Sequence, residues 1–171
     1  MSIKKKVLIS VILVITATLV AGLIGFFINN DDKELLKMEN PYTITYYANE
    51  EKTEGFSLQL SNNFSSKITV SVDKPIDGLQ SYSFKHSDSN EILFIVYISD
   101  GEAYKQLSGK YEVLDKSDKY TYVWTQSVED NTHILDETKR KEFNEIAKYY
   151  ATIKSTVQIV SATGDNVPVT K

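Results

Sequence analysis

The chain has no cysteine, only two histidines and only seven glycines among its 171 residues. Without cysteine it can form no disulfide, no thiolate metal site and no cysteine nucleophile, and it cannot be anchored through a lipid-modified cysteine. None of the glycines is spaced as a phosphate-binding loop or as the GxGxxG motif of a dinucleotide-binding domain. These absences exclude thiol chemistry and the common nucleotide-binding motifs.

Acidic residues are missing from the N-terminal part of the chain. Lys4, Lys5 and Lys6 precede Val7, whereas all 23 Asp and Glu residues follow Ile28. Of the 19 Lys and Arg residues, 16 remain after Ile28, and 16 against 23 gives that part a formal charge of −7. An acidic domain without a basic stripe is a poor nucleic-acid binder, so we expect no nucleic-acid partner.

The segment Val7–Ile28 contains no charged residue and predicts one transmembrane helix. A helix of this length spans about 33 Å, close to the hydrocarbon thickness of a membrane. The basic tip at residues 1–6 predicts a cytoplasmic N-terminus and an extracellular remainder, a single-pass arrangement in the cell membrane. The alternative is a cleaved signal peptide, whose apolar core is usually about 7–15 residues. The best cleavage site ends at Ala21, but Leu19 stands where a small residue is needed, so we favour an uncleaved signal-anchor.

The rest of the chain predicts a linker at 29–41, one extracytoplasmic α+β domain at 42–160 and a flexible tail at 161–171. Strict alternation of apolar and polar residues is typical of half-buried strands. Strands of this kind are predicted at Phe56–Leu60, Ile68–Val72 and Tyr82–His86.

Three further strand predictions rest on composition. Tyr42–Tyr47 is rich in Tyr, Thr and Ile and predicts a first edge strand. Ile92–Ile98 is apolar throughout and predicts a central strand buried on both faces. Tyr111–Leu114 and Tyr120–Thr125 flank a short polar turn and predict a hairpin.

An amphipathic helix is predicted from Asp136 to about Val157. Its apolar stripe recurs every three or four residues, with Asp136 as the N-cap. The stripe includes Phe143, Ile146, Tyr150 and Ile153, and the polar positions between include Glu142, Glu145, Lys148 and Thr152. We expect an antiparallel β-sheet packed with this helix, and a short helix at Ala103–Leu107 that covers the other sheet face.

Several strand patterns resemble a domain type of Gram-positive bacteria. Gly55–Leu60 is similar to the "GFSLxLP" strand of small exported domains, and Leu93–Val96 is similar to their "LFxI" strand. Tyr111–Leu114 with Tyr120–Val123 resembles their closing hairpin. The opening strand is also similar to that of PsbP-like domains, which share a sheet-and-helix sandwich with the Mog1 fold. The resemblance implies this fold and an exported location, but no catalytic residue.

Candidate chemistry is sparse. His86 ends a strand on the face of Tyr82 and Phe84 and predicts a partly buried ring with one hydrogen-bond partner. His133 falls in a polar loop and is predicted to be solvated. The turn Asp73–Gly78 resembles a calcium loop, but Pro75 and Phe84 occupy positions where oxygen ligands are required. We predict no catalytic, cofactor-binding or metal-binding residue, and no cofactor.

The eleven tyrosines allow two interpretations. Tyrosine is typical of binding surfaces for peptides and glycans, and equally of ordinary strands. Tyr120, Tyr122 and Trp124 share one face of a strand, so they form either a core against the helix or an open aromatic patch. We expect the core, because burial of large rings is favourable.

The sequence therefore predicts a membrane-anchored extracytoplasmic binding or accessory domain that is not an enzyme. Its partners would be the membrane, through the N-terminal helix, and an unidentified protein or glycan of the cell envelope. The alternative is a small cell-envelope hydrolase with a site that no motif reveals.

Overall fold

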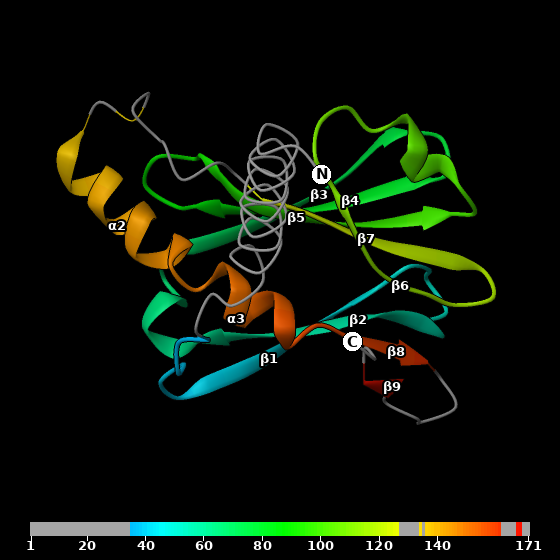
Figure 1. The fold of residues 1–171 in the computed structure, drawn as a ribbon, viewed down its shortest axis with the longest axis horizontal. Coiled ribbons are helices and arrows are strands. Elements are labelled where there is room, and N and C mark those ends of the chain that lie inside the picture. Colours follow the sequence, from blue (N-terminus) through cyan, green and yellow to red (C-terminus); the bar gives the residue numbers. More distant parts are fainter. Residues whose placement is uncertain (1–34, 127–133, 135, 162–166, 169–171) are drawn as a thin grey trace, which may run out of the picture. The chain divides into compact units, whose positions relative to one another are not determined.

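The computed structural model describes residues 35–126, 134, 136–161 and 167–168 (Figure 1). The chain divides into two compact units, 1–34 and 35–171, and every described residue belongs to the second. In the described part of the chain, no helix is long and apolar enough to cross a membrane. The predicted transmembrane segment Val7–Ile28 lies outside the described residues.

The first sheet has the strand order β1-β2-β8-β9, and its neighbours are antiparallel. Its strands are β1 (Pro41–Tyr47), β2 (Glu54–Ser61), β8 (Gln158–Ser161) and β9 (Val167–Pro168). The prediction of an edge strand at Tyr42–Tyr47 is confirmed. The sequence did not predict β8 or β9. Because β8 has four residues and only Ile159 is buried, it shows no alternation.

The second sheet has the order β3-β4-β5-β7-β6, again antiparallel. Its strands are β3 (Ile68–Ile76), β4 (Leu79–His86), β5 (Ile92–Asp100), β6 (Glu112–Lys116) and β7 (Tyr120–Gln126). The predicted central strand and the predicted hairpin are both confirmed. One detail was wrong: Ile92 is 40% exposed, because it starts the strand at the β4–β5 turn, and burial begins at Leu93.

Two helices replace the single predicted helix. They are α2 (Glu137–Ala147) and α3 (Tyr150–Ser155). The N-cap prediction is confirmed, because a side-chain oxygen of Asp136 accepts a hydrogen bond from the backbone N–H of Lys139 at 3.0 Å. The helix is interrupted where the backbone N–H of Tyr149 donates to the carbonyl of Ile146, a tight three-residue turn. The interruption lets the Tyr149 ring pack edge-on against Phe64 at 5.2 Å.

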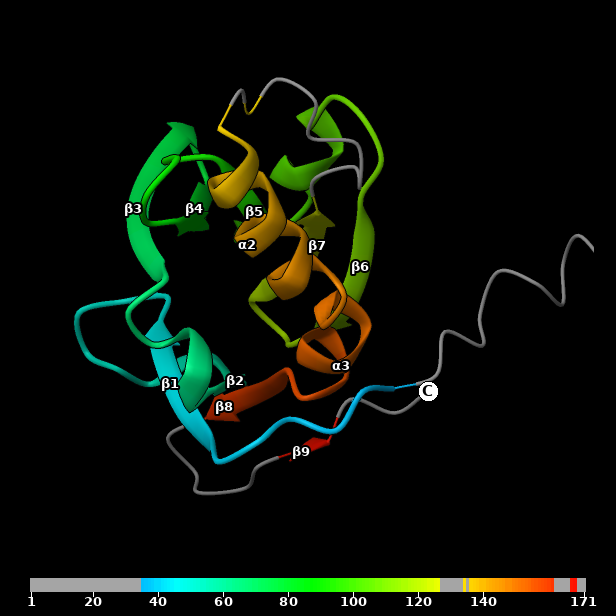
Figure 2. The same ribbon diagram turned by 90° about the vertical axis from the view of Figure 1, so that its left-hand side faces the viewer.

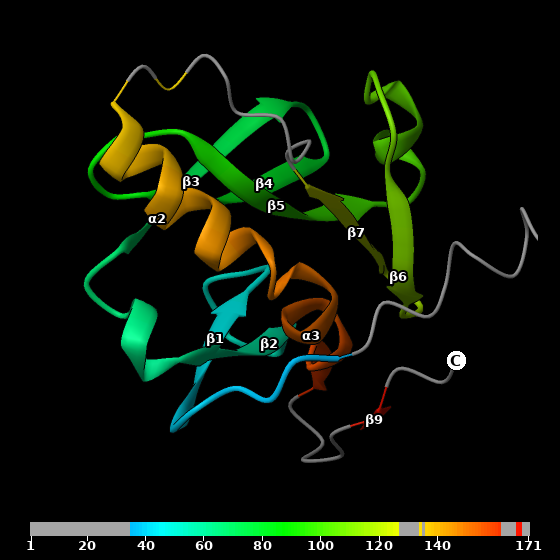
Figure 3. The same cartoon turned by 60° about the vertical axis from the view of Figure 1, so that its left-hand side comes forward.

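The fold class, α+β, is confirmed, but there are two sheets where the sequence predicted one. Figures 2 and 3 show α2 lying along β5 and α3 lying along β2. One core joins both sheets and both helices, and includes Phe56, Phe84, Phe94, Trp124, Phe143 and Ile153. Thr152, predicted on the polar face, is instead buried, and its hydroxyl donates to the carbonyl of Leu36.

The opposite face of the second sheet is covered as predicted. A 3-10 helix, η2 (Ala103–Gln106), carries the buried ring of Tyr104. Tyr104 packs with Leu79 and Val123 in a second, smaller core. This small core explains why β5 and β7 bury residues on both faces.

Gly55, which opens the predicted "GFSLxLP"-like strand, is required by close packing of two strands. A Cβ at this position would lie 2.0 Å from the backbone oxygen of Tyr46 on β1. Only glycine allows β1 and β2 to approach so closely here. The rest of the pair continues without a register shift from Pro41 opposite Ser61 to Tyr47 opposite Gly55.

Candidate functional site

The turn between β4 and β5 places a serine hydroxyl beside a histidine ring. The backbone N–H of His86 donates to the carbonyl of Glu91, and the N–H of Asn90 donates to the carbonyl of His86. Asn90 takes a positive φ of 58°, a conformation that asparagine tolerates well. This turn brings Ser89 back over the strand end, with its Oγ 2.9 Å from Nδ1 of His86.

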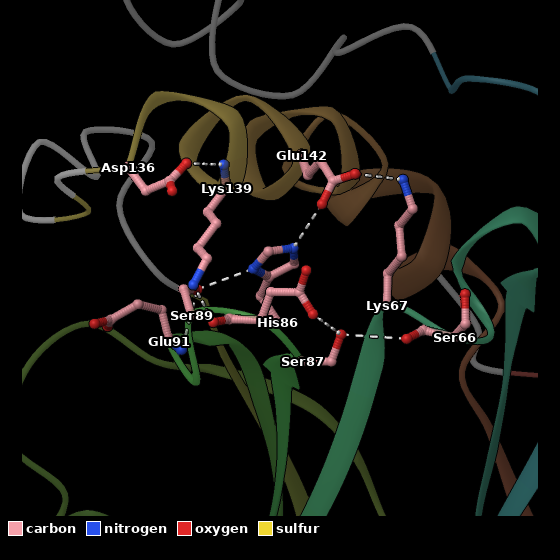
Figure 4. A network of polar contacts seen from close by, with 10 residues as sticks. Ser66, Lys67, His86, Ser87, Ser89, Glu91, Asp136, Lys139 and Glu142 are labelled. Carbon is pink, nitrogen blue, oxygen red and sulfur yellow. Dashed lines mark hydrogen bonds and ion pairs between the residues drawn. The ribbon is translucent and has the colours of Figure 1, made fainter.

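Helix α2 brings a carboxylate to the other side of the same ring. Oε2 of Glu142 lies 3.7 Å from Nε2 of His86, and Oε1 of Glu142 lies 3.0 Å from Nζ of Lys67 (Figure 4). Lys67 stands just before β3, so this ion pair joins the helix to the sheet. The Glu142 side chain is one-third exposed, so solvent reaches the ion pair but not the ring.

The contacts indicate one placement of protons. Nε2 of His86 is buried without a hydrogen bond among the described residues, and a carboxylate oxygen of Glu142 lies 3.7 Å from it. A proton on Nε2 points toward that carboxylate, and Nδ1 then accepts from the hydroxyl of Ser89. The order of contacts, from the hydroxyl of Ser89 through the imidazole of His86 to the carboxylate of Glu142, is that of a catalytic triad. The ring nitrogens have opposite roles, because in serine proteases Nε2 faces the serine and Nδ1 faces the carboxylate.

Burial limits what this arrangement can do. The His86 side chain is 0% exposed, so no atom of the ring is open to a substrate. Ser89 is half-buried, and its Oγ also lies 3.4 Å from the backbone N–H of Glu91. Since no substrate can reach the His86 ring, His86 can act as a general base only by accepting the hydroxyl proton of Ser89.

A second contact fastens α2 to the same turn. Nζ of Lys139, in the first turn of the helix, donates to the backbone carbonyl of Asp88 at 3.0 Å. The backbone N–H of that lysine is already held by the N-cap, Asp136. Together with the Lys67–Glu142 ion pair, this contact pins the helix to the end of the second sheet at two points.

The structure corrects the prediction for His86 and extends it. The ring is completely rather than partly buried, because Phe143 of α2 packs edge-on against it at 6.2 Å. Ser89, Glu142 and Lys67 were not singled out from the sequence. Helix α2, which carries Glu142, lies far along the chain from β4, so no local motif joins them. The second histidine, His133, lies outside the described residues.

The residues of the rejected calcium-loop match lie in a strand and the turn that follows it. Asp73 lies within β3, and Gly78 forms the turn to β4 with a positive φ of 72°. Among the residues that the structure describes, no group of three or more His, Asp or Glu side chains is placed to hold a metal ion.

The aromatic face of β7 belongs to the core, as predicted. Tyr122 and Trp124 are buried, and the Trp124 ring stacks on Phe94 at 4.4 Å. Burial raises the pKa of Tyr122 well above the usual range for tyrosine, and the nearby negative charge of Glu54 raises it further. Its hydroxyl has no hydrogen-bond partner in the described part of the chain. The tyrosines on this strand therefore form no open binding patch.

The resemblance to exported bacterial domains rests on strand residues that the structure places in the core, such as Phe56, Leu58 and Leu60. Core residues of this kind recur in many folds. The membership in that group stays a prediction. We found no protein-family model, no curated protein and no solved structure that matches this chain.

Proposed function

We propose that this chain is a single-pass, membrane-anchored protein whose extracytoplasmic domain acts as a non-catalytic binding or accessory module. The uncharged segment Val7–Ile28 and the lysines before it support the anchor and its orientation. We also propose that the domain is a sheet-and-helix sandwich of the PsbP-like and Mog1-like type, a proposal that the strand pattern Gly55–Leu60 supports. Its partner is a protein or glycan of the cell envelope.

The burial of His86 is the observation that carries the non-catalytic assignment. Its ring is sealed between β4 and α2, and its neighbours Glu142 and Lys67 hold the helix against the sheet. Partly exposed ion pairs of this kind contribute roughly 0.2–1 kcal/mol to stability. The cluster is thus a structural clamp, and recognition takes place on the exposed surface.

A hydrolase is the second candidate, favoured by the 2.9 Å contact between Ser89 Oγ and His86 Nδ1. In that case the imidazole would take the proton of the hydroxyl as the hydroxyl attacks, and Glu142 would stabilise the imidazolium. This function requires that the turn open so that Ser89 reaches a substrate.

A fluorophosphonate probe, which forms a covalent bond with activated serines, separates the two candidates. We expect the full-length protein to remain unlabelled at a concentration that labels a known serine hydrolase. Ser89→Ala is the matched control. Labelling that disappears in Ser89→Ala and in His86→Gln, with both variants still folded, would establish the hydrolase instead.

Protease added to intact cells tests the anchor. We expect digestion of the domain with survival of a short N-terminal fragment, detected through a tag before Lys4. Full-length protein that resists digestion while control exported proteins are cleaved would contradict the orientation. Release of soluble protein into the medium would instead indicate a cleaved signal peptide.

A further inference from the structure

The edge strand β1 lacks the features with which edge strands avoid pairing. An edge strand presents unpaired backbone N–H and C=O groups, and proteins protect such edges with charges, prolines, bulges or short length. In the second sheet, edge strand β3 contains Asp73–Pro75, with both charge and proline, and shifts register there. Edge strand β6 has five residues, three of them charged, and also shifts register.

By contrast, β1 contains no charged residue and no register shift. All seven of its residues pair in continuous register with β2. Among the described residues, β2 is the one strand that pairs with β1. Its single proline is the first residue, Pro41, where it interrupts no further pairing. At its end, the carbonyl of Tyr47 accepts a hydrogen bond from the hydroxyl of Tyr82 at 2.6 Å. The outer edge of β1 is therefore a regular template for another strand from Tyr42 to Tyr46.

The sequence of β1 indicates what that other strand is. Tyr42-Thr43-Ile44-Thr45-Tyr46 reads the same in both directions. If two copies of this strand pair antiparallel about a two-fold axis at Ile44, every residue meets its own kind. Tyr42 lies opposite Tyr46 of the second copy, and Thr43 lies opposite Thr45 of the second copy. Aromatic pairs and threonine pairs are both favourable across antiparallel strands.

The two faces of the strand also agree with this pairing. Tyr42, Ile44 and Tyr46 are half-buried and pack against the core, so a neighbouring strand would cover the part that is still exposed. Thr43 and Thr45 are exposed on the opposite face. Two-fold pairing places apolar residues beside apolar residues and hydroxyls beside hydroxyls.

We propose that β1 pairs antiparallel with β1 of a second copy of this chain, so that the first sheets of the two copies form one continuous sheet. The interface is isologous, since the same strand serves on both sides. The proposal does not depend on the membrane anchor or on a particular ligand.

Cysteine cross-linking tests the register, because the chain has no cysteine of its own. Full-length Thr43→Cys and Thr45→Cys proteins are purified separately in mild detergent, mixed and oxidised gently. We expect the mixed 43–45 disulfide to exceed either same-site disulfide about tenfold, because only the directly opposite positions come within disulfide reach. The yields of random pairing, with the mixed species in only its statistical excess, or no cross-linked product, would overturn the proposal.

Charge variants test the same contact without a covalent bond. Thr43→Lys/Thr45→Lys places like charges opposite each other twice, and we expect the dissociation constant of the dimer to rise about tenfold or more in sedimentation. Thr43→Lys/Thr45→Glu places opposite charges at the same positions and should preserve the dimer. Both sites are exposed, so far-UV circular dichroism should match the unmodified protein. Equal association of the two variants, or a monomeric unmodified chain, would refute pairing through β1.

Discussion

The two sheets are assembled in different ways. In the second sheet, β3, β4 and β5 follow one another as hairpins, and β6 and β7 form another hairpin. In the first sheet, β2 pairs with β8 from the far end of the domain, with Glu54 opposite Ser161. Pairing across such a distance costs chain entropy before any contact forms. The second sheet thus forms largely from strands that are neighbours in the sequence. The first sheet is complete only when β8, near the end of the domain, has paired with β2.

The two sheets also contribute different residues to the core. The second sheet supplies the stacked rings of Phe84, Phe94 and Trp124. The first sheet supplies Phe56, Leu58 and Leu60 of β2 and Ile159 of β8, and its β1–β2 pair requires glycine at position 55. Damage to the ring stack should therefore unfold the domain, whereas damage to the first sheet should first release β1.

The largest effect is expected in the ring stack. Trp124→Ala removes a side chain that is 2% exposed, and should lower the free energy of unfolding by roughly 3–5 kcal/mol. Chemical denaturation of the full-length protein, followed by far-UV circular dichroism, measures this loss. Because Trp124 is the only tryptophan, the unmodified protein should show blue-shifted emission that acrylamide quenches poorly. Readily quenched, water-like emission would contradict the core position.

The next effect is expected in the first sheet. Gly55→Ala forces a methyl group against the backbone of Tyr46 and should lower the free energy of unfolding by about 3 kcal/mol. Hydrogen exchange should show faster exchange at β1 amides while amides of β5 stay protected. Thr69→Ala, an exposed substitution on β3 of the second sheet, serves as the control. Equal loss of protection in both sheets would show that the sheets do not open separately.

Alkaline pH should lower the stability of the domain through the buried hydroxyl of Tyr122. In the unfolded chain, Tyr122 loses its proton near the ordinary pKa of 10.0, whereas burial raises its pKa in the folded state. The folded state then holds more protons, so stability falls as the pH rises above 10. At pH 11 we expect a loss of about 1.4 kcal/mol from one such tyrosine.

Tyr122→Phe is the matched control for the pH experiment. It removes a buried hydroxyl that has no partner among the described residues, so the free energy of unfolding at neutral pH should stay level or rise. The slope above pH 10 should become shallower in this variant, since the burial-shifted pKa of Tyr82 and Tyr46 still contributes. An unchanged slope would show that Tyr122 is not the main titrating group.

The smallest effect is expected where α3 meets the first sheet. The hydroxyl of Thr156 accepts a hydrogen bond from the backbone N–H of Gln59 at 2.9 Å. Thr156→Val keeps the shape but removes this acceptor, and should lower the free energy of unfolding by about 1 kcal/mol. Thr69→Val, at an exposed threonine of β3 in the second sheet, is the control and should change stability little. Equal effects of the two substitutions would contradict a role for the hydrogen bond.

Local pattern was sufficient for most individual elements. The alternation in Phe56–Leu60 and Tyr82–His86, the apolar run Ile92–Ile98 and the helical stripe after Asp136 each predicted an element that is present. A strand or helix with one buried face has apolar residues at regular spacing along that face, so its own sequence predicts it. The interruption of the helix near Tyr149 could not be predicted in this way, because the spacing of apolar residues continues through it.

The candidate site was predictable only in part. The sequence placed His86 on an apolar face, but Ser89 and Glu142 became its neighbours through a turn and a distant helix. From the sequence alone, a polar residue on a helix is predicted to face solvent, because its partner in the folded structure is not known. This is why Glu142 and Thr152 appeared equivalent in the sequence, although one remains partly exposed and the other is buried.

The amino-acid sequence by itself determined the α+β class, the order of most elements and the burial of the aromatic strand, because period-two and helical patterns depend only on near neighbours. The tertiary structure decided that there are two sheets, that β8 closes the first and that His86 is sealed by α2. It also decided that Ser89 and Glu142 meet at the His86 ring. Each of these depends on which distant segments meet, and that is fixed by the packing of the whole core rather than by any one segment.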